Sequence, residues 1–222
     1  TMGRYSHENK LKDFADGKYD ILLGTQMVAK GLDFENVTLV GVINADQQLN
    51  NDDFRSQERT FDLLTQVVGR AGRGQYKGTA VIQTCNPEND VIQIAARQDY
   101  DAFFKDELKT RKMLIYPPYC DICLIGFIGE NEPKVRVASQ KYTDRLKEKL
   151  SGEYKDLKII ALGPMTARVS KISNKFRYRL ILKCKNTKRF RALMNELLKY
   201  TGTDRAYNDV SVYIDINPEN II

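Results

Sequence analysis

The sequence predicts an α/β chain of two domains. The order of strands and helices along the chain differs between the two domains. In the first half, apolar strands alternate with helices, the pattern of a parallel sheet with flanking helices. In the second half, the order strand, helix, strand, strand, helix, strand describes a four-stranded antiparallel sheet. Between them lie Pro117 and Pro118, which cannot continue a helix and favour extended chain. We therefore predict domains at residues 1–116 and 117–222.

The first 50 residues predict one helix and two strands. Ser6 is suited to cap a helix over residues 7–16, and Gly17 is suited to end it. The apolar run at residues 20–24 predicts a short buried strand, and the β-branched run at residues 37–44 predicts another. Both suit a parallel sheet that is covered on its two faces.

The loop after the first predicted strand carries polar groups at the edge where open α/β sheets bind ligands. Thr25 offers a hydroxyl and a backbone amide to a phosphate, and Gly31 permits backbone angles that other residues resist. Asp33 can accept a hydrogen bond from a ribose hydroxyl or an arginine. The alternative interpretation is an ordinary turn from strand to loop.

A predicted helix over residues 54–68 leads into a sequence rich in glycine and arginine, residues 66–74. Arg70 and Arg73 place two guanidinium groups on one turn of chain with little side-chain bulk around them. A guanidinium group can donate two parallel hydrogen bonds to the oxygens of one phosphate. Such a group can also act as an arginine finger on a nucleotide. A glycine-rich turn with solvated arginines is the alternative. Residues 79–84 then predict a strand, and residues 90–97 and 100–112 predict two helices.

The second domain has the strand and helix order of a ferredoxin-like β-α-β-β-α-β unit, with two helices on one face of an antiparallel sheet. Helical spacing of apolar residues distinguishes its helices, and alternation of apolar and polar residues distinguishes the third strand. The predicted strands are residues 121–129, 157–162, 175–185 and 210–216, and the predicted helices are residues 132–150 and 187–200.

Basic residues concentrate in the second domain. Residues 1–116 hold 15 Lys and Arg against 17 Asp and Glu, whereas residues 117–222 hold 20 against 12, which together give the net charge of +6. This excess favours nucleic acid or an acidic peptide as a partner. A basic surface that only maintains solubility is the alternative.

Two basic clusters are candidate binding residues. Lys175, Arg177 and Arg179 alternate with Phe176 and Tyr178, so cations for phosphates lie beside aromatic rings for unpaired bases. The alternative is a solvated sheet face with both rings turned to the core. The second cluster surrounds the start of the last predicted helix and includes Arg189.

Cysteine use and hydropathy suggest a reduced, cytoplasmic protein. Cys120 and Cys123 form a Cys-x-x-Cys pair, but Cys85 and Cys184 stand alone and His7 is the only histidine, so no zinc set is complete. We expect the cysteines to pack as small apolar side chains, with metal or redox use as the alternative. No apolar run reaches the ~18 residues needed to cross a membrane.

Two stretches resemble motifs of superfamily 2 helicases. Residues 21–31, Ile-Leu-Leu-Gly-Thr-Gln-Met-Val-Ala-Lys-Gly, resemble the fifth motif, and residues 66–74, Gln-Val-Val-Gly-Arg-Ala-Gly-Arg-Gly, resemble the sixth. With Asp-Phe-Arg-Ser-Gln-Glu-Arg at residues 53–59 and the two prolines beyond, the chain is most similar to the PriA family of replication-restart DNA helicases, also called primosomal protein N′. The resemblance implies that residues 1–116 are part of a RecA-like second helicase lobe.

The resemblance also implies roles for single residues. Gln66, Arg70 and Arg73 match positions that reach ATP bound mainly to the other lobe, with Arg73 as the finger. Gly31 and Asp33 match positions near the ATP cleft, and Thr25 and Gln26 match positions near the DNA backbone. The family implies DNA forks and junctions, the acidic tail of single-stranded-DNA-binding protein and other primosome proteins as partners, and Arg189 is a candidate for partner binding.

Several family features are missing from this sequence. It has no Gly-x-x-x-x-Gly-Lys-Ser/Thr loop, since Gly17-Lys18 is followed by Tyr19, and it has no Asp-Glu-x-His motif or cysteine cluster for zinc. We therefore expect a carboxyl-terminal part of a longer protein, with ATP, Mg²⁺ and zinc bound mainly upstream. Alone it is expected not to hydrolyse ATP, and a non-enzymatic nucleic-acid-binding module is the alternative function.

Overall fold

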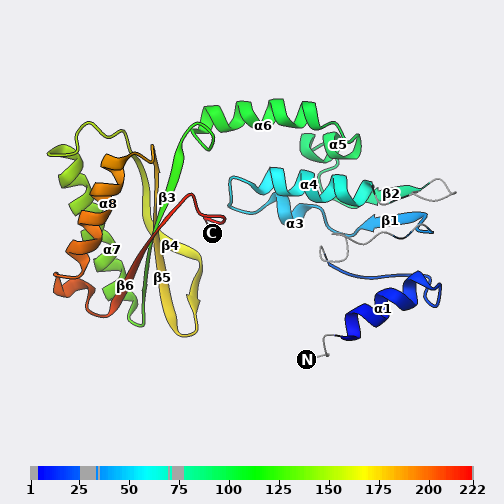
Figure 1. Cartoon of the computed structure of the whole chain (residues 1–222), viewed down its shortest axis with the longest axis horizontal. Coiled ribbons are helices and arrows are strands. Elements are labelled where there is room, and N and C mark those ends of the chain that lie inside the picture. Colours follow the sequence, from blue (N-terminus) through cyan, green and yellow to red (C-terminus); the bar gives the residue numbers. More distant parts are fainter. Residues whose placement is uncertain (1–4, 26–33, 35, 70, 72–77, 222) are drawn as a thin grey trace. The chain divides into compact units, whose positions relative to one another are not determined.

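The computed structural model describes residues 5–25, 34, 36–69, 71 and 78–221. It divides into two compact units, Thr1–Glu107 and Leu108–Ile222, here called the N-terminal and C-terminal units (Figure 1). The division falls inside helix α6 (Tyr100–Leu114). The boundary that the two prolines predict lies further along the chain and stays a prediction.

The N-terminal unit contains a parallel strand pair and several helices. Strand β1 (Leu39–Val42) pairs in parallel with β2 (Thr79–Ile82), from Leu39 opposite Thr79 to Val42 opposite Ile82. The parallel sheet that the sequence predicts is therefore confirmed in this pair. Among the described residues, the helices of the unit are α1 (Tyr5–Ala15), α3 (Asp46–Leu49), α4 (Ser56–Val68), α5 (Asp90–Ala96) and the first part of α6.

Its core lies where α4 packs against α5 and α6. Phe61 and Phe103 are almost fully buried, and their rings stack at a centroid distance of 4.2 Å. Leu64 from α4 and Ala95 from α5 belong to the same apolar cluster. The apolar stripe that predicted the long helix is thus the face that it buries.

The prediction of a strand at residues 20–24 was wrong. These residues have no regular secondary structure, and the side chains of Ile21 and Leu23 are 84% and 79% exposed. A short apolar run becomes a strand only where a neighbouring strand supplies its hydrogen bonds. None of the described strands pairs with this segment.

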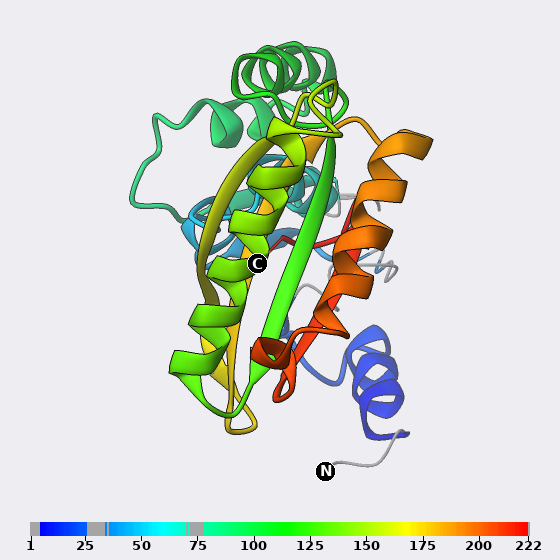
Figure 2. The same ribbon diagram turned by 90° about the vertical axis from the view of Figure 1, so that its left-hand side faces the viewer.

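The C-terminal unit has the predicted ferredoxin-like order. Its sheet has the order β4-β5-β3-β6 with every neighbouring pair antiparallel, and Figures 1 and 2 show both long helices on the same face. The elements are β3 (Asp121–Gly129), α7 (Glu132–Ser151), β4 (Ile160–Ile172), β5 (Lys175–Cys184), α8 (Lys188–Thr201), the 3-10 helix η1 (Arg205–Tyr207) and β6 (Val210–Ile216).

The core of this unit lies between the helices and the sheet. Phe127 and Leu180 of the sheet and Tyr142 and Phe190 of the helices are all 0% exposed. The helices begin at side-chain caps, since Asn131 accepts from the backbone amide of Lys134 at 3.1 Å, and a threonine performs the same role before α8. Patterning and capping therefore agree with the fold in this half of the chain.

Strand β4 is much longer than the predicted strand at residues 157–162. It runs to Ile172, with register shifts against β5 after Leu162 and after Thr166, and it joins β5 through Ser173 and Asn174. Both turn residues have positive φ, 48° and 62°, which matches the two-residue hairpin turn favoured by the twist of antiparallel strands. The two strands thus form a hairpin.

A clasp of hydrogen bonds joins the start of β3 to the end of β6. The backbone amide of Asn217 donates to the carbonyl of Ile122 at 2.7 Å, and its side-chain oxygen accepts from the amide of Ile122 at 3.0 Å. The side-chain amide of Asn217 also donates to Asp121 at 2.9 Å, which, with the amide of Asn186, lowers the pKa of the Asp121 carboxyl. The first and last strands are therefore held together at one end.

The hydrogen bonds of Asp204 predict that the C-terminal unit loses stability in acid. Its carboxylate accepts hydrogen bonds from the Tyr200 hydroxyl at 2.6 Å, the Ala206 amide at 2.8 Å and Lys141, which together lower its pKa to about 2. Because the folded state prefers the charged form, this stabilisation is complete above the unfolded pKa of about 4 and is lost as the pH falls towards 2.

We expect the Asp204→Asn variant to lose part of this acid dependence. Urea unfolding at pH values from about 5 down to 2 should show a smaller decline in unfolding free energy for the variant than for the wild type. The control is Asp144→Asn, which removes an exposed carboxylate from α7 and should keep the wild-type dependence. Identical pH profiles for wild type and Asp204→Asn would contradict the prediction.

In the described part of the chain, no helix is long and apolar enough to span a membrane. All four cysteines are free, and Cys123 and Cys184 are buried in the core of the C-terminal unit, where burial raises the pKa of each thiol to about 12. These two side chains therefore pack as small apolar groups. Among the described residues, no group of three or more His, Cys, Asp or Glu side chains is arranged to hold a metal ion.

Candidate functional site

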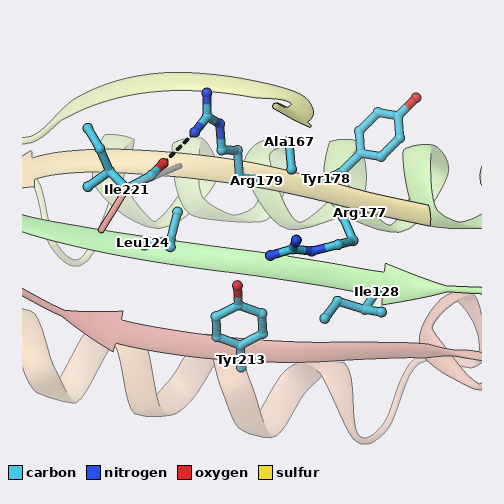
Figure 3. A pocket seen from close by; sticks show the side chains of 8 residues that line it. All are labelled: Leu124, Ile128, Ala167, Arg177, Tyr178, Arg179, Tyr213 and Ile221. Carbon is cyan, nitrogen blue, oxygen red and sulfur yellow. Dashed lines mark hydrogen bonds between the residues drawn. The ribbon is translucent and has the colours of Figure 1, made fainter. Parts of the chain in front are cut away.

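The face of the sheet opposite α7 and α8 is the candidate site in the C-terminal unit. Figure 3 shows side chains from all four strands and from the segment after β6 around a shallow depression. The free volume in this depression is about 10 Å³, about what one water molecule requires. It is therefore a packed surface and not an enclosed small-molecule site. We call it the open face. The depression is lined by Leu124, Ile128, Ala167, Arg177, Tyr178, Arg179, Tyr213 and Ile221, although the Tyr178 ring packs against the core on the other side of the sheet.

Strand alternation places the predicted cations and the predicted aromatics on opposite faces. Arg177 and Arg179 lie on the open face, whereas Tyr178 packs against the helix-covered core and its hydroxyl donates to Glu132 of α7 at 3.2 Å. The ring of Phe176 lies 4.7 Å from the ammonium of Lys171. The ring of Tyr178 is thus turned to the core, as the alternative interpretation predicted.

Arg179 holds the chain segment that follows β6. One terminal nitrogen of its guanidinium donates to the carbonyl of Ile221, as Figure 3 shows, and the side chain of Ile221 is only 4% exposed. The Nε atom of Arg179 is buried and has no hydrogen-bond partner. Arg179 therefore has a structural contact on the open face, and its predicted role in DNA binding stays a prediction.

Arg177 differs from Arg179 because its guanidinium is not engaged. It lies opposite Ile128 in the strand register, and Figure 3 shows it extended across β3 towards Tyr213. Within the described residues it has neither a hydrogen bond nor an ion pair. Lys175 is exposed at the start of β5, next to the hairpin turn. These two cations are available to an anionic ligand.

Tyr213 is a residue of this face that the sequence analysis missed. It lies opposite Gly126, and a Cβ atom added to that glycine would be 2.1 Å from the tyrosine ring. The ring therefore lies directly over the glycine backbone, and 38% of the residue remains exposed. The available signal was a glycine within an otherwise apolar strand, which often marks a close approach by another group.

Replacing Gly126 with alanine is expected to displace the Tyr213 ring and lower the free energy of unfolding by about 1–3 kcal/mol. Removing the ring should remove most of this cost, so Gly126→Ala in a Tyr213→Ser background should cost much less than in the wild type. Urea unfolding of the four proteins measures this coupling. The control is Gly41→Ala on β1, where an added Cβ meets no atom within 4 Å. A full cost in both backgrounds would contradict the packing argument.

Arg189, the candidate for partner binding, is tied to the segment after α7. Its Nε donates to Asp156 at 2.8 Å, another nitrogen donates to the carbonyl of Glu153, and the guanidinium lies 4.9 Å from the Tyr154 ring centre. These contacts fix the start of α8 against the preceding segment. The role of Arg189 in partner binding is untested and stays a prediction.

Few of the predicted nucleotide-site residues fall in the described part of the N-terminal unit. Thr25 and Gln66 are both exposed, and Gln66 lies near the carboxyl end of α4. Beside it, an open groove of about 340 Å³ is lined by Asp62, Gly69, Gln98 and Tyr100, among others. The remaining predicted residues, Gln26, Gly31, Asp33, Arg70 and Arg73, lie outside the described residues.

The ends of the two parallel strands are linked by Asp46. Its carboxylate accepts from the Thr84 hydroxyl at 2.7 Å and from the Cys85 amide at 2.8 Å, and these hydrogen bonds lower its pKa. Asp46 follows β1 and the other two residues follow β2. This polar group at the carboxyl edge of the strand pair therefore has a structural role in holding the two strand ends together.

Two family models match different parts of the chain. Residues 1–75 match the helicase conserved C-terminal domain, and residues 112–219 match the primosomal protein N C-terminal domain. A parallel α/β unit of the first kind followed by a basic ferredoxin-like unit defines the carboxyl-terminal region of a helicase-type protein.

Curated relatives narrow this class to one family. The chain is 40% identical over 98% of its length to the replication restart protein PriA of Bacillus subtilis, 42% over 82% to that of Synechocystis, and 37% over 96% to that of Borreliella burgdorferi. The chain belongs to the PriA family. It spans 26%, 21% and 31% of the lengths of these three relatives.

Solved structures add no argument about the fold. The de novo designed protein Foldit4, 13% identical, aligns with 45% of this chain and 98% of its own at a TM-score of 0.32. An amidase of the hydantoinase/carbamoylase family from Burkholderia ambifaria, 15% identical, aligns with 44% of this chain and 27% of its own at a TM-score of 0.31. Both scores are too low to relate the folds.

Proposed function

We propose that this chain is the carboxyl-terminal part of an ATP-dependent DNA helicase that reloads the replication machinery at stalled forks. The observation that carries the proposal is the combination, in one chain, of a helicase C-terminal domain at residues 1–75 with a PriA-type C-terminal domain at residues 112–219. The relatives that share both parts are replication restart proteins.

In this proposal, the N-terminal unit senses the nucleotide. ATP with Mg²⁺ binds mainly to the parts of the longer relatives that this chain does not span, and its hydrolysis supplies the free energy for movement. Gln66, Arg70 and Arg73 contact the phosphates across the lobe interface, and Gly31 and Asp33 line the same cleft. The exposed amide of Gln66 beside an open groove fits such a contact. No zinc site is proposed for the described residues.

The C-terminal unit supplies the contacts to DNA and to other proteins. Its exposed Lys175 and unpaired Arg177 suit phosphate contacts at forks and at junctions of single and double strands. Thr25 and Gln26 add contacts to the DNA backbone from the N-terminal unit. Arg189 and its basic neighbours at the start of α8 suit acidic peptides, such as the tail of single-stranded-DNA-binding protein and parts of other primosome proteins.

The test is ATP hydrolysis with and without forked DNA. A protein with the full length of the relatives should hydrolyse ATP faster when DNA is present, and the 222-residue chain alone should not hydrolyse ATP. The chain alone should bind forked DNA with an affinity that falls steeply between ~50 and ~200 mM salt. DNA binding without any DNA-stimulated hydrolysis in the longer protein would favour the second function, a non-enzymatic nucleic-acid-binding module, which the basic excess of residues 117–222 supports.

A further inference from the structure

We propose that the open face of the C-terminal unit binds a single-stranded stretch of DNA, with one unpaired base stacked on Tyr213 and an adjacent phosphate on Arg177. This inference rests on the proposed DNA-binding function of the unit and names the form of DNA that this face takes. The observations that carry it are a tyrosine ring lying on the sheet surface and, on the same face, the guanidinium of Arg177, which has no hydrogen bond or ion pair to any residue that the structure describes (Figure 3).

The position of Tyr213 makes it a stacking platform. Its ring lies over the backbone of Gly126, where any side chain would collide with it, so one side of the ring is packed against the sheet. The residue is still 38% exposed, and within the described residues its hydroxyl makes no hydrogen bond that would fix the ring for another purpose. Base stacking on such an exposed ring depends little on sequence, since every base has a flat apolar face.

The form of the DNA follows from the geometry of stacking. In a duplex, each base is already stacked between its neighbours, so an aromatic ring on a flat sheet reaches only an unpaired base. Four-stranded sheets with two helices behind them offer a broad surface for this purpose, and RNA-recognition domains of similar architecture stack bases on sheet aromatics. Here α7 and α8 cover the opposite face, so they leave the ring accessible (Figure 2).

Charge decides where the phosphates lie. Arg177 on β5 and Tyr213 on β6 flank β3, so they are two strand spacings apart, ~10 Å, and the long arginine side chain extends into that gap. Asp215, also exposed on β6 two residues beyond the ring, would repel a phosphate. We therefore expect the bound single-stranded DNA to run from Tyr213 towards Arg177 and on to Lys175, away from Asp215.

The segment after β6 limits the site on its other side. Ile221 is buried beside Arg179 and Leu124, and its carbonyl accepts from Arg179. This contact occupies the guanidinium that would otherwise compete with Arg177 for the phosphate. Tyr213 and Arg177 remain uncovered by this segment, so they form the part of the open face that is accessible to DNA.

The test uses a fluorescent reporter at the stacking position. The chain contains no tryptophan, so Tyr213→Trp introduces a single indole into the full 222-residue chain. An oligothymidylate of about 10 nucleotides should quench its fluorescence on binding. The matched control is Tyr119→Trp. Tyr119 has the same 38% exposure as Tyr213 but lies just before the first residue of β3, away from Gly126. Its fluorescence should not change.

Affinity measurements complete the test. Tyr213→Leu should bind the oligothymidylate roughly tenfold more weakly than the wild type, whereas Tyr213→Phe, which keeps the ring, should bind equally well. A duplex of equal length should bind both variants as it binds the wild type. Arg177→Gln should weaken the binding of both DNAs, because phosphates are common to them.

The outcomes separate this inference from the proposed function. Equal binding of the single strand by Tyr213→Leu and the wild type, or no quenching in Tyr213→Trp, overturns the stacking role. Equal loss of single-strand and duplex binding in Tyr213→Leu overturns it as well. If the wild-type chain binds neither DNA at low salt, the proposed DNA-binding function itself fails. The unfolding free energies of Tyr213→Phe and Tyr213→Leu are measured as a control. If they are equal, weaker DNA binding by Tyr213→Leu does not result from unfolding.

Discussion

Replacing Arg73 with alanine in a protein of the relatives' full length is expected to lower DNA-stimulated ATP hydrolysis by ~10³ or more. Arg73 lies in the stretch of sequence, residues 66–74, that resembles the sixth helicase motif. Charge that develops on the transferring phosphate is stabilised by such a group in the transition state more than in bound ATP. The turnover number should therefore fall much more than the affinity for ATP.

Steady-state kinetics with and without forked DNA, together with nucleotide binding, measure this split. Arg136→Ala on α7 is the matched control, because Arg136 is an exposed arginine of the C-terminal unit outside the helicase motifs, and it should keep wild-type turnover. Arg70→Ala should show a smaller loss if Arg70 makes only a second phosphate contact. Wild-type turnover in Arg73→Ala would remove the finger role.

Replacing Phe127 with alanine is expected to lower the free energy of unfolding of the C-terminal unit by about 3–5 kcal/mol. Phe127 of β3 is 0% exposed, and its ring meets that of Tyr142 edge to face at a centroid distance of 5.4 Å. The substitution removes buried apolar surface and leaves a cavity between the sheet and α7, which a well-packed core fills only in part.

Urea unfolding in a Tyr213→Trp background reports on this unit alone, because the wild-type chain has no tryptophan. The control is Val137→Ala on the solvent side of α7, where the residue is 52% exposed, and it should change stability by less than about 0.5 kcal/mol. A loss below about 1 kcal/mol for Phe127→Ala would show that the rings do not form the core described here.

The C-terminal unit was easier to predict than the N-terminal unit, for a physical reason. Strands β3 and β6 begin and end where the sequence predicts, because their patterns are bounded by turn residues and the neighbouring helix carries a side-chain cap. The strand predicted at residues 20–24 failed because an apolar run by itself does not show whether a pairing strand exists. Strand β4 exceeds its prediction because its second half is mostly exposed and mixes polar with apolar residues, so pairing with β5 alone defines it.

The candidate site was predictable only in part. Alternation along β5 identified the basic residues correctly as neighbours on one strand, but the sequence did not decide which face carries Tyr178. Tyr213 was missed because its importance depends on Gly126, a residue far away in the sequence that becomes its neighbour only across the β3–β6 pairing. The contact between Arg179 and the Ile221 carbonyl was equally invisible, since backbone groups leave no pattern in a sequence.

The clasp between Asn217 and the start of β3 brings the two ends of the sheet domain close together, which affects where the domain can be inserted in other proteins. Because Asn217 bonds directly to Asp121 and Ile122, the sheet domain begins and finishes at nearly the same point in space. Compact folds with adjoining ends tolerate circular permutation and insertion into host loops. The adjoining ends of this sheet are therefore compatible with insertion of the unit, including the segment up to Ile221 that Arg179 holds, into a loop of another protein.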